Sequence, residues 1–173
     1  MSRTLLLMRH AKSAWDAPFT HDAERVLSKR GRRDAPRMGE WMADSGLIPD
    51  LVLCSSAVRA RQTAEAVLER LDLPPSICRY EPRLYSAAVE GLLGVVADCP
   101  PDRRNVLLVG HNPGLEDLCL YLCGSDLPRT PKGKLMTTAA LALIELPEAW
   151  SELSEGSGNL LKLIRPKDLF SRL

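Results

Sequence analysis

Residues 4–13 read TLLLMRHAKS, an apolar run that ends in a cluster of polar side chains. Two further stretches repeat this plan: LVLC is followed by SSAVR at 51–59, and VLLV is followed by GHNPG at 106–114. Each apolar run is continuous rather than alternating, which is typical of a strand covered on both faces of a sheet. The three stretches therefore predict three buried strands, each with chemically active residues at its carboxyl end.

Further apolar runs and helical patterns extend this plan along the chain. Strands are expected at 4–8, 51–54, 76–80, 106–109, 139–145 and 159–164, and helices at about 28–44, 57–71, 87–98 and 113–122. Alternation of strands and helices favours a mainly parallel sheet with helices on both faces. We expect an α/β fold with three layers, α/β/α, and one domain over residues 1–173, because no linker divides the chain.

Some local features conflict with this regular pattern or interrupt it. Pro36 lies inside the first helix and should kink it or move its start, and Gly31 weakens the same helix. The stretch SDLPRTPKGK at 125–134 predicts a polar loop, and EGSG at 155–158 predicts a hairpin turn between the last two strands.

The composition is that of an ordinary globular protein and argues against several classes of partner. The 173 residues include 23 Lys+Arg and 22 Asp+Glu, for a net charge of +1, and 45% are hydrophobic. The chain lacks the basic excess of a nucleic-acid-binding protein, and its normal apolar content argues against disorder. A chain of this length buries roughly 70% of its unfolded surface, so it needs no metal or disulfide to hold a core.

The cysteines and the longest apolar runs predict the compartment. The five cysteines fit neither a disulfide framework nor a four-cysteine zinc site, and free cysteines suit a reducing compartment. We expect Cys54 and Cys78 to be buried, and Cys119 and Cys123 to share a helix face. No run reaches the ~18 apolar residues of a membrane span, and the run at 5–8 is too short for a signal peptide. The sequence therefore predicts a cytoplasmic protein without a membrane segment.

The residues at the strand ends are suited to binding an anion. Two of the three histidines, His10 and His111, and two arginines, Arg9 and Arg59, fall in the three clusters. Ligands of open parallel sheets bind beyond the carboxyl ends of the strands, so the clusters should form one pocket. Guanidinium groups match phosphate oxygens with a planar fork of donors. The sequence therefore predicts a phosphoryl-binding pocket.

Two local expectations accompany this pocket. Helix starts at Ser56 and Asn112 would add backbone N–H groups and a positive dipole end. Neighbouring residues of a strand point to opposite faces, so Arg9 and His10 reach one pocket only if the strand has ended near Met8.

The same residues define a reaction that calls for no metal or cofactor. A neutral histidine attacks phosphorus as a nucleophile, while arginines and a second histidine stabilise the charge. Taken singly, Arg9-His10 could be a loop pair, Arg59 a surface ion-pair partner and His111 a helix-start residue. Their equivalent positions after three strands favour the catalytic interpretation. His21 has no such setting, and we expect it on the surface or in a loop.

Three motifs of the chain resemble those of one family in the same order. LLLMRHAKSAW resembles the Arg-His-Gly opening of the histidine phosphatase superfamily, with Ala11 where Gly is commoner, and SSAVRARQTAEAV and LVGHNPGLEDL resemble its second and third motifs. The resemblance covers most of the chain and implies the phosphoglycerate-mutase-like fold. The short length, the Arg-His-Ala start and Thr137-Thr138 before a late strand are most similar to the SixA-type phosphohistidine phosphatases.

The resemblance also implies roles for individual residues. His10 would be the nucleophile that becomes phosphorylated, Arg9 and Arg59 would bind phosphate oxygens, and His111 would bind the same group and stabilise the transition state. Ser13 stands where many relatives place a further phosphate ligand. Asp16 is left out, because a carboxylate there would repel phosphate.

The proton donor departs from the pattern of the family. Many relatives carry an acid just after the third strand, whereas Ser86 is nearest that slot here and Glu81, five residues earlier, is the candidate donor. A missing acid would disfavour alkyl phosphates more than phosphohistidine, whose imidazole leaves readily. A phosphohistidine-bearing protein is thus the first substrate hypothesis, and a small-molecule phosphomonoester is the second. A catalytically inactive phosphate-binding adaptor is the hypothesis from another class.

The basic run Lys29, Arg30, Arg32 and Arg33 has two interpretations. It could dock an acidic protein that carries the phosphohistidine, or it could be a solvated helix face. The oligomeric state is not indicated by the sequence.

Overall fold

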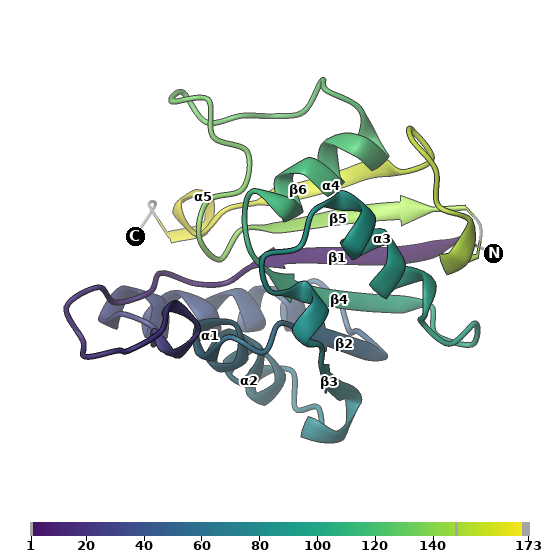
Figure 1. The fold of residues 1–173 in the computed structure, drawn as a ribbon. Helices are drawn as coiled ribbons and strands as arrows, with labels where there is room; N and C mark the ends of the chain where they lie inside the picture. The colour runs from purple at the N-terminus through teal and green to yellow at the C-terminus, as the bar shows by residue number, and fades with distance from the viewer. Residues whose placement is uncertain (1, 148, 171–173) are drawn as a thin grey trace.

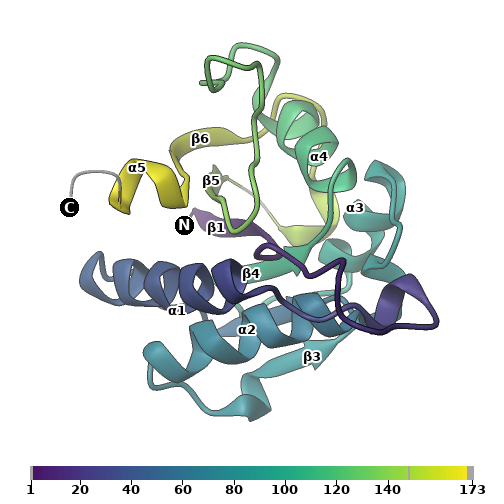
Figure 2. The ribbon, with the colours of Figure 1, turned by 90° about the vertical axis from the view of Figure 1, so that its left-hand side faces the viewer.

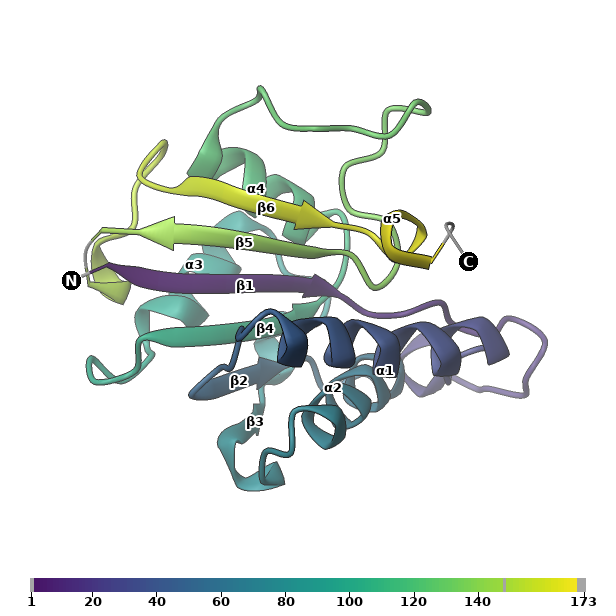
Figure 3. The same ribbon diagram turned by 180° about the vertical axis from the view of Figure 1, so that it is seen from behind.

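A six-stranded sheet forms the middle layer of the computed structural model, which describes residues 2–147 and 149–170. The strand order is β3-β2-β4-β1-β5-β6 (Figure 1). The pairs β1–β4, β2–β4 and β2–β3 are parallel, whereas β5 runs antiparallel to both β1 and β6 (Figure 3). The strands are β1 (Arg3–Arg9), β2 (Leu51–Cys54), β3 (Cys78–Tyr80), β4 (Asn105–Gly110), β5 (Leu141–Leu146) and β6 (Asn159–Ile164). The mainly parallel sheet predicted from the sequence is confirmed.

Helices cover both faces of this sheet, as Figure 2 shows. One buried cluster holds Leu5 and Leu7 of β1 with side chains of α3 (Val89–Ala97) and α4 (Gly114–Cys123). The other holds Leu6 and Met8 with side chains of α1 (Lys29–Asp44) and α2 (Val58–Arg70). Because alternate residues of β1 enter different cores, both must be apolar, which explains the continuous run in the sequence. A short α5 (Pro166–Phe170) follows β6.

The first helix continues through its proline. It begins at Lys29, where the Ser28 hydroxyl accepts a hydrogen bond from the Gly31 amide, and it ends at Asp44. The prediction that Pro36 moves the helix start is wrong, because this cap fixes the start and packing of Met38 and Met42 in the core holds the remainder.

Gly31 lies where the backbone of the first loop touches α1. A Cβ at this position would lie 2.1 Å from the Lys12 carbonyl oxygen. The Ser28 amide donates to the same oxygen at 2.8 Å. The helix-weakening glycine is therefore required by a close backbone contact.

Two details of the sheet differ from expectation. The connection from β5 to β6 contains a 3-10 helix, Trp150–Glu152, so EGSG at 155–158 is only the last part of a longer link. The Trp150 indole donates to the Arg103 carbonyl at 2.9 Å and folds this link onto the core. Cys78 is half-buried rather than buried, because β3 is an edge strand. Within the described ranges, no helix is long and apolar enough to cross a membrane.

Candidate active site

The end of β1 places its two polar residues in one pocket. The strand ends at Arg9, one residue later than predicted, and His10 follows it directly. The Ala11 amide then donates to Thr63 Oγ1 of α2 at 3.0 Å, which turns the chain away from the sheet. Arg9 and His10 both line a pocket of about 570 Å³, so the requirement that the strand end near Met8 is met.

The ends of three parallel strands meet at this pocket. Arg9, His10, Arg59 and His111 line it together, as the sequence predicted, and Ser13 lines it as well. The two helices begin later than expected, α2 at Val58 and α4 at Gly114, because the residues after β2 and β4 first form turns. The rest of the pocket lining consists of Lys12, Trp15, Asp22, Arg25, Tyr85, Ser86, Ala87, Ala88, Asn112, Pro113, Gly114, Asp117 and Thr138.

His10 has a free ring nitrogen and no charge at neutral pH. Its Nδ1 lies 2.7 Å from the Ala11 carbonyl oxygen. Since a carbonyl can only accept, Nδ1 carries the hydrogen and Nε2 keeps its lone pair. Burial, and then the nearby His111, Arg59 and Arg9, lower the pKa of His10 to about 3. The side chain therefore has the protonation state of a nucleophile.

His111 lies beside His10, with ring centroids 5.1 Å apart. Its Nε2 is 2.7 Å from the Ser55 hydroxyl, which accepts from the Ala57 amide at 3.2 Å. Burial, followed by the charge of Arg59, lowers the pKa of His111 to about 4. The first turn after β2 thus orients the histidine that follows β4.

Several buried nitrogen atoms of this pocket have no hydrogen-bond partner within the described residues. They are Arg9 Nε, Arg59 Nε and His111 Nδ1. Arg9 Nη1 donates to the Met136 carbonyl at 3.1 Å, and the side-chain amide of Asn112 donates to the same oxygen at 2.8 Å. A buried polar group without a partner costs about 1–3 kcal/mol. The arrangement is suited to an anion with several acceptor oxygens, which a phosphoryl group provides.

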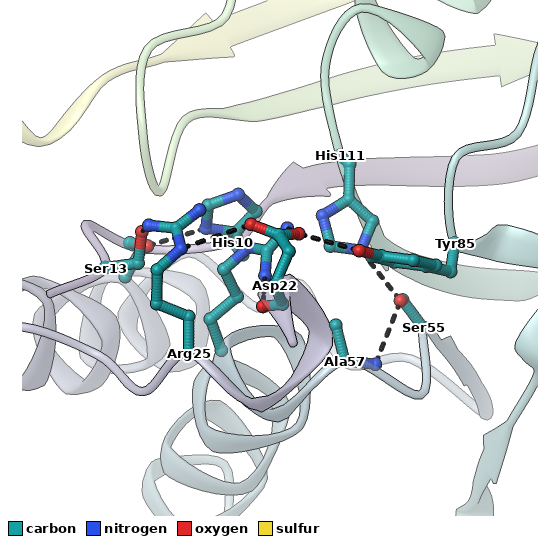
Figure 4. A network of polar contacts seen from close by, with 10 residues as sticks. His10, Ser13, Asp22, Arg25, Ser55, Ala57, Tyr85 and His111 are labelled. Atoms are coloured by element: carbon teal, nitrogen blue, oxygen red, sulfur yellow. Dashed lines mark hydrogen bonds and ion pairs between the residues drawn. The ribbon is translucent and has the colours of Figure 1, made fainter. Parts of the chain in front are cut away.

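Sequence reasoning missed a carboxylate that lines the pocket. Asp22 accepts from Arg59 Nη2 at 2.9 Å and from the Tyr85 hydroxyl at 2.7 Å, and it pairs with Arg25 Nε at 3.3 Å (Figure 4). Hydrogen bonding by Tyr85, and then by Arg59 and Arg25, lowers the pKa of Asp22 to about 2. The carboxylate is therefore ionised at neutral pH.

Arg25 is a further missed residue of the pocket. It is 6% exposed, its Nη1 donates to the Ser13 hydroxyl, and its guanidinium lies 3.6 Å from the ring centroid of Trp15. An isolated bridge between Ser13 and Leu27 brings the segment of Arg25 beside the first loop. No motif in THDAER marks Asp22 or Arg25, so only this tertiary pairing could have revealed them.

The candidate proton donor is not brought to the pocket. Glu81 is absent from the pocket lining, and its carboxylate accepts from the Arg83 amide at 3.1 Å and pairs with the Arg83 guanidinium. Hydrogen bonds from Arg83 lower the pKa of Glu81. The position of Glu81 in the sequence suggested a proton donor, but its contacts with Arg83 hold the carboxylate away from the pocket. His21 is exposed, as expected.

The basic run is exposed on α1, but part of its charge is already paired. Arg30 and Arg33 form ion pairs with Asp34, at 3.5 and 3.2 Å, and Asp34 is 2% exposed. Arg32 donates to the Leu27 carbonyl. These pairs support the interpretation of a solvated helix face.

The fold and the pocket define a class of protein, an α/β protein with two neutral histidines and two arginines at the ends of parallel strands. A family model described as the histidine phosphatase superfamily (branch 1) matches residues 5–85. The chain belongs to the histidine phosphatase superfamily.

Three relatives show how far the similarity extends. An uncharacterized chloroplastic protein of Arabidopsis thaliana is 32% identical over 91% of this chain and 73% of its own length. The phosphohistidine phosphatase SixA of Escherichia coli is 29% identical over 84% of this chain and 86% of its own. A solved structure of the protein histidine phosphatase SixA complexed with tungstate superposes with a TM-score of 0.80 at 27% identity, covering 96% of this chain and 99% of that one. The cytoplasmic location of this chain stays a prediction.

Proposed function

We propose that this phosphatase transfers a phosphoryl group from its substrate to Nε2 of His10 and then to water, and that protein-bound phosphohistidine is the substrate. The observation that carries the proposal is a neutral His10 with a free Nε2, in a pocket where Arg9 Nε, Arg59 Nε and His111 Nδ1 have no hydrogen-bond partner among the described residues. A pocket that only bound phosphate would have no need of an uncharged nucleophile at its base.

The reaction has two displacements. In the first, the lone pair of His10 Nε2 forms a bond to phosphorus while the bond from phosphorus to the substrate nitrogen breaks. That electron pair returns to the substrate imidazole, which takes a proton from solvent. In the second, water attacks the phosphorus, the bond to Nε2 breaks, and inorganic phosphate leaves with His10 restored. Arg9, Arg59 and His111 stabilise the charge on the equatorial oxygens in both steps.

The states of Asp22 and Glu81 favour phosphohistidine over alkyl phosphates. An alkoxide leaving group needs a proton from an acid, whereas an imidazole leaves readily. Asp22 is held ionised by its three donors, and Glu81 points to Arg83, so neither carboxyl supplies that proton. The name of the Escherichia coli relative, a phosphohistidine phosphatase, supports the same substrate class.

One observation favours a second candidate, a small-molecule phosphomonoesterase. Asp117, in the first turn of α4, lines the pocket and is exposed. If it protonated an alkoxide, Asp117→Asn would abolish hydrolysis of alkyl phosphates and spare that of an activated aryl phosphate. The first candidate instead predicts little alkyl phosphatase activity in the wild type, with or without Asp117.

The test compares wild type with His10→Ala in the presence of EDTA. We expect the wild type to hydrolyse an activated aryl phosphate and a phosphohistidine-bearing protein, and His10→Ala to lose both activities by at least about 10⁴-fold. Equal rates for the two proteins would contradict the role of His10. Binding of inorganic phosphate without turnover of either substrate would favour the inactive adaptor.

A further inference from the structure

Asp22 is a feature of the pocket that the proposed function leaves unexplained. A carboxylate repels a phosphoryl group, yet this side chain lies among the cations that would bind one. It belongs to a short 3-10 helix, Asp22–Glu24, in the loop between β1 and α1. The contacts of Asp22 decide whether it fills the phosphoryl site or shapes it.

Asp22 holds Arg59 by both terminal nitrogens of its guanidinium. Arg59 Nη1 donates to the Asp22 backbone carbonyl at 2.8 Å, and Nη2 donates to the Asp22 carboxylate at 2.9 Å. Arg59 Nε is buried and has no partner within the described residues. The two contacts fix the plane of the guanidinium and use two of its five N–H groups, so that the Nε–H is among those left for a ligand.

Two other side chains fix Asp22 itself. Arg25 pairs with Asp22 Oδ1 through its Nε at 3.3 Å, while its Nη1 donates to Ser13. The Tyr85 hydroxyl donates to Oδ2 at 2.7 Å. Figure 4 shows Asp22 between Arg25 on one side and Tyr85 on the other. Because three side chains contact its carboxylate and Arg59 also bonds to its backbone carbonyl, Asp22 has a fixed position in the pocket wall.

We propose that Asp22 is a positioning residue that orients Arg59 toward the transferred phosphoryl group, with Arg25 and Tyr85 holding Asp22 in place. The proposal rests on the proposed function, since it assigns Arg59 to the phosphoryl group. A carboxylate that merely occupied the site would take the donors that a substrate needs. Here the backbone carbonyl shares the contact, and Arg59 Nε, Arg9 Nε and His111 Nδ1 all stay unpaired.

The first experiment measures kcat and KM for an activated aryl phosphate with Asp22→Ala. Misplacing a catalytic group costs about 100-fold, and we expect kcat/KM to fall by about that factor. Glu24→Ala is the matched control, because Glu24 lies in the same 3-10 helix, is exposed and bonds only weakly to the Thr20 amide, at 3.4 Å. The control should keep the wild-type rate. An unchanged or higher kcat/KM for Asp22→Ala would overturn the proposal.

The second experiment tests whether Asp22 acts through Arg59. A positioning residue has no further effect once its target is gone, so Asp22→Ala in an Arg59→Ala background should lower kcat/KM by less than about threefold. A loss of about 100-fold in both backgrounds would mean that Asp22 acts independently and would overturn the proposal. Asp22→Asn keeps the size of the side chain and the backbone carbonyl, and it should show the same dependence on Arg59 if Asp22→Ala fails to fold.

Binding of inorganic phosphate separates this proposal from the proposed function. We expect Asp22→Ala to raise the Kd for phosphate about tenfold in the wild-type background and to leave it unchanged in the Arg59→Ala background. Tighter binding by Asp22→Ala would show that the carboxylate competes with the ligand, which would overturn the proposal. If the wild type lacked phosphatase activity, the proposed function would fail while this binding measurement would still decide the role of Asp22.

Discussion

The pocket is built from two regions of different origin. The clusters after β1, β2 and β4 reach it because the carboxyl ends of parallel strands share one edge of the sheet. The loop from Ala14 to Arg25 reaches it through side-chain contacts, with Arg25 bonded to Ser13 and Asp22 bonded to Arg59. The topology of the sheet therefore places the first region, which we call the strand-end region. The position of the second, the loop region, depends on its side-chain contacts with the strand-end region.

The two regions also differ in the roles of their side chains. The strand-end region supplies the neutral His10 and the unpaired donors around it. The loop region supplies a carboxylate and a guanidinium that are paired with each other and with the first region. We therefore expect substitutions in the strand-end region to cost more activity than those in the loop.

Apart from loss of the nucleophile His10 itself, the largest effect is expected for Arg59→Ala, which removes a phosphoryl-binding side chain that follows β2. Loss of one donor to a developing charge costs about 10²–10³-fold in kcat, and kcat for an aryl phosphate should fall by that factor. Arg61→Ala is the matched control, because Arg61 is exposed on the same helix and stacks on Tyr80 outside the pocket. Equal losses for the two variants would contradict the assignment of Arg59.

A substitution at the contact between the cluster after β1 and α1 should destabilise the fold. In Gly31→Ala the new Cβ would overlap the Lys12 carbonyl oxygen, and we expect the free energy of unfolding in urea to fall by about 1–3 kcal/mol. Gly94→Ala is the control, because a Cβ there meets nothing within 4 Å. Gly94→Ala should stabilise α3 by about 0.5–1 kcal/mol. Equal stability of the two variants would show that the backbone at Lys12 moves away from α1 without cost.

A smaller loss of activity is expected for Arg25→Ala in the loop region. Arg25 touches the phosphoryl site through Asp22 and Ser13, so kcat/KM should fall about tenfold, less than for Arg59→Ala. The stacked Trp15 ring should become more exposed, which would be measured as a shift of tryptophan fluorescence. A loss as large as that of Arg59→Ala would remove the distinction between the two regions.

The pH dependence of stability should report the buried His10. Its pKa is about 3 in the folded chain, against 6.5 for an ordinary histidine. Between these values the unfolded chain binds a proton that the folded chain does not, so this group lowers the free energy of unfolding as the pH falls from about 6.5 to about 3. Urea unfolding at several pH values should therefore show a shallower decline for His10→Asn than for the wild type. Parallel curves would contradict the lowered pKa.

Local patterns were enough to predict the strands, the three layers and the convergence of Arg9, His10, Arg59 and His111, because these depend on apolar runs and strand direction. Other features depend on contacts that no local pattern encodes. Trp150 folds the β5–β6 link through a bond to Arg103, and Glu81 turns to Arg83 rather than to the pocket. Asp16, which is left out because a carboxylate repels phosphate, is exposed and is absent from the pocket lining. The same rule gave no hint of Asp22, whose charge is offset by two arginines.

The central claim is that His10 carries the phosphoryl group during turnover. The direct measurement is to mix the protein with ³²P-labelled phosphohistidine protein, quench in alkali and identify the labelled peptide. The account predicts acid-labile, alkali-stable label on the peptide that contains His10 in the wild type, and none in His10→Ala. Full turnover by the wild type with no label on that peptide, or label on another residue, would contradict it.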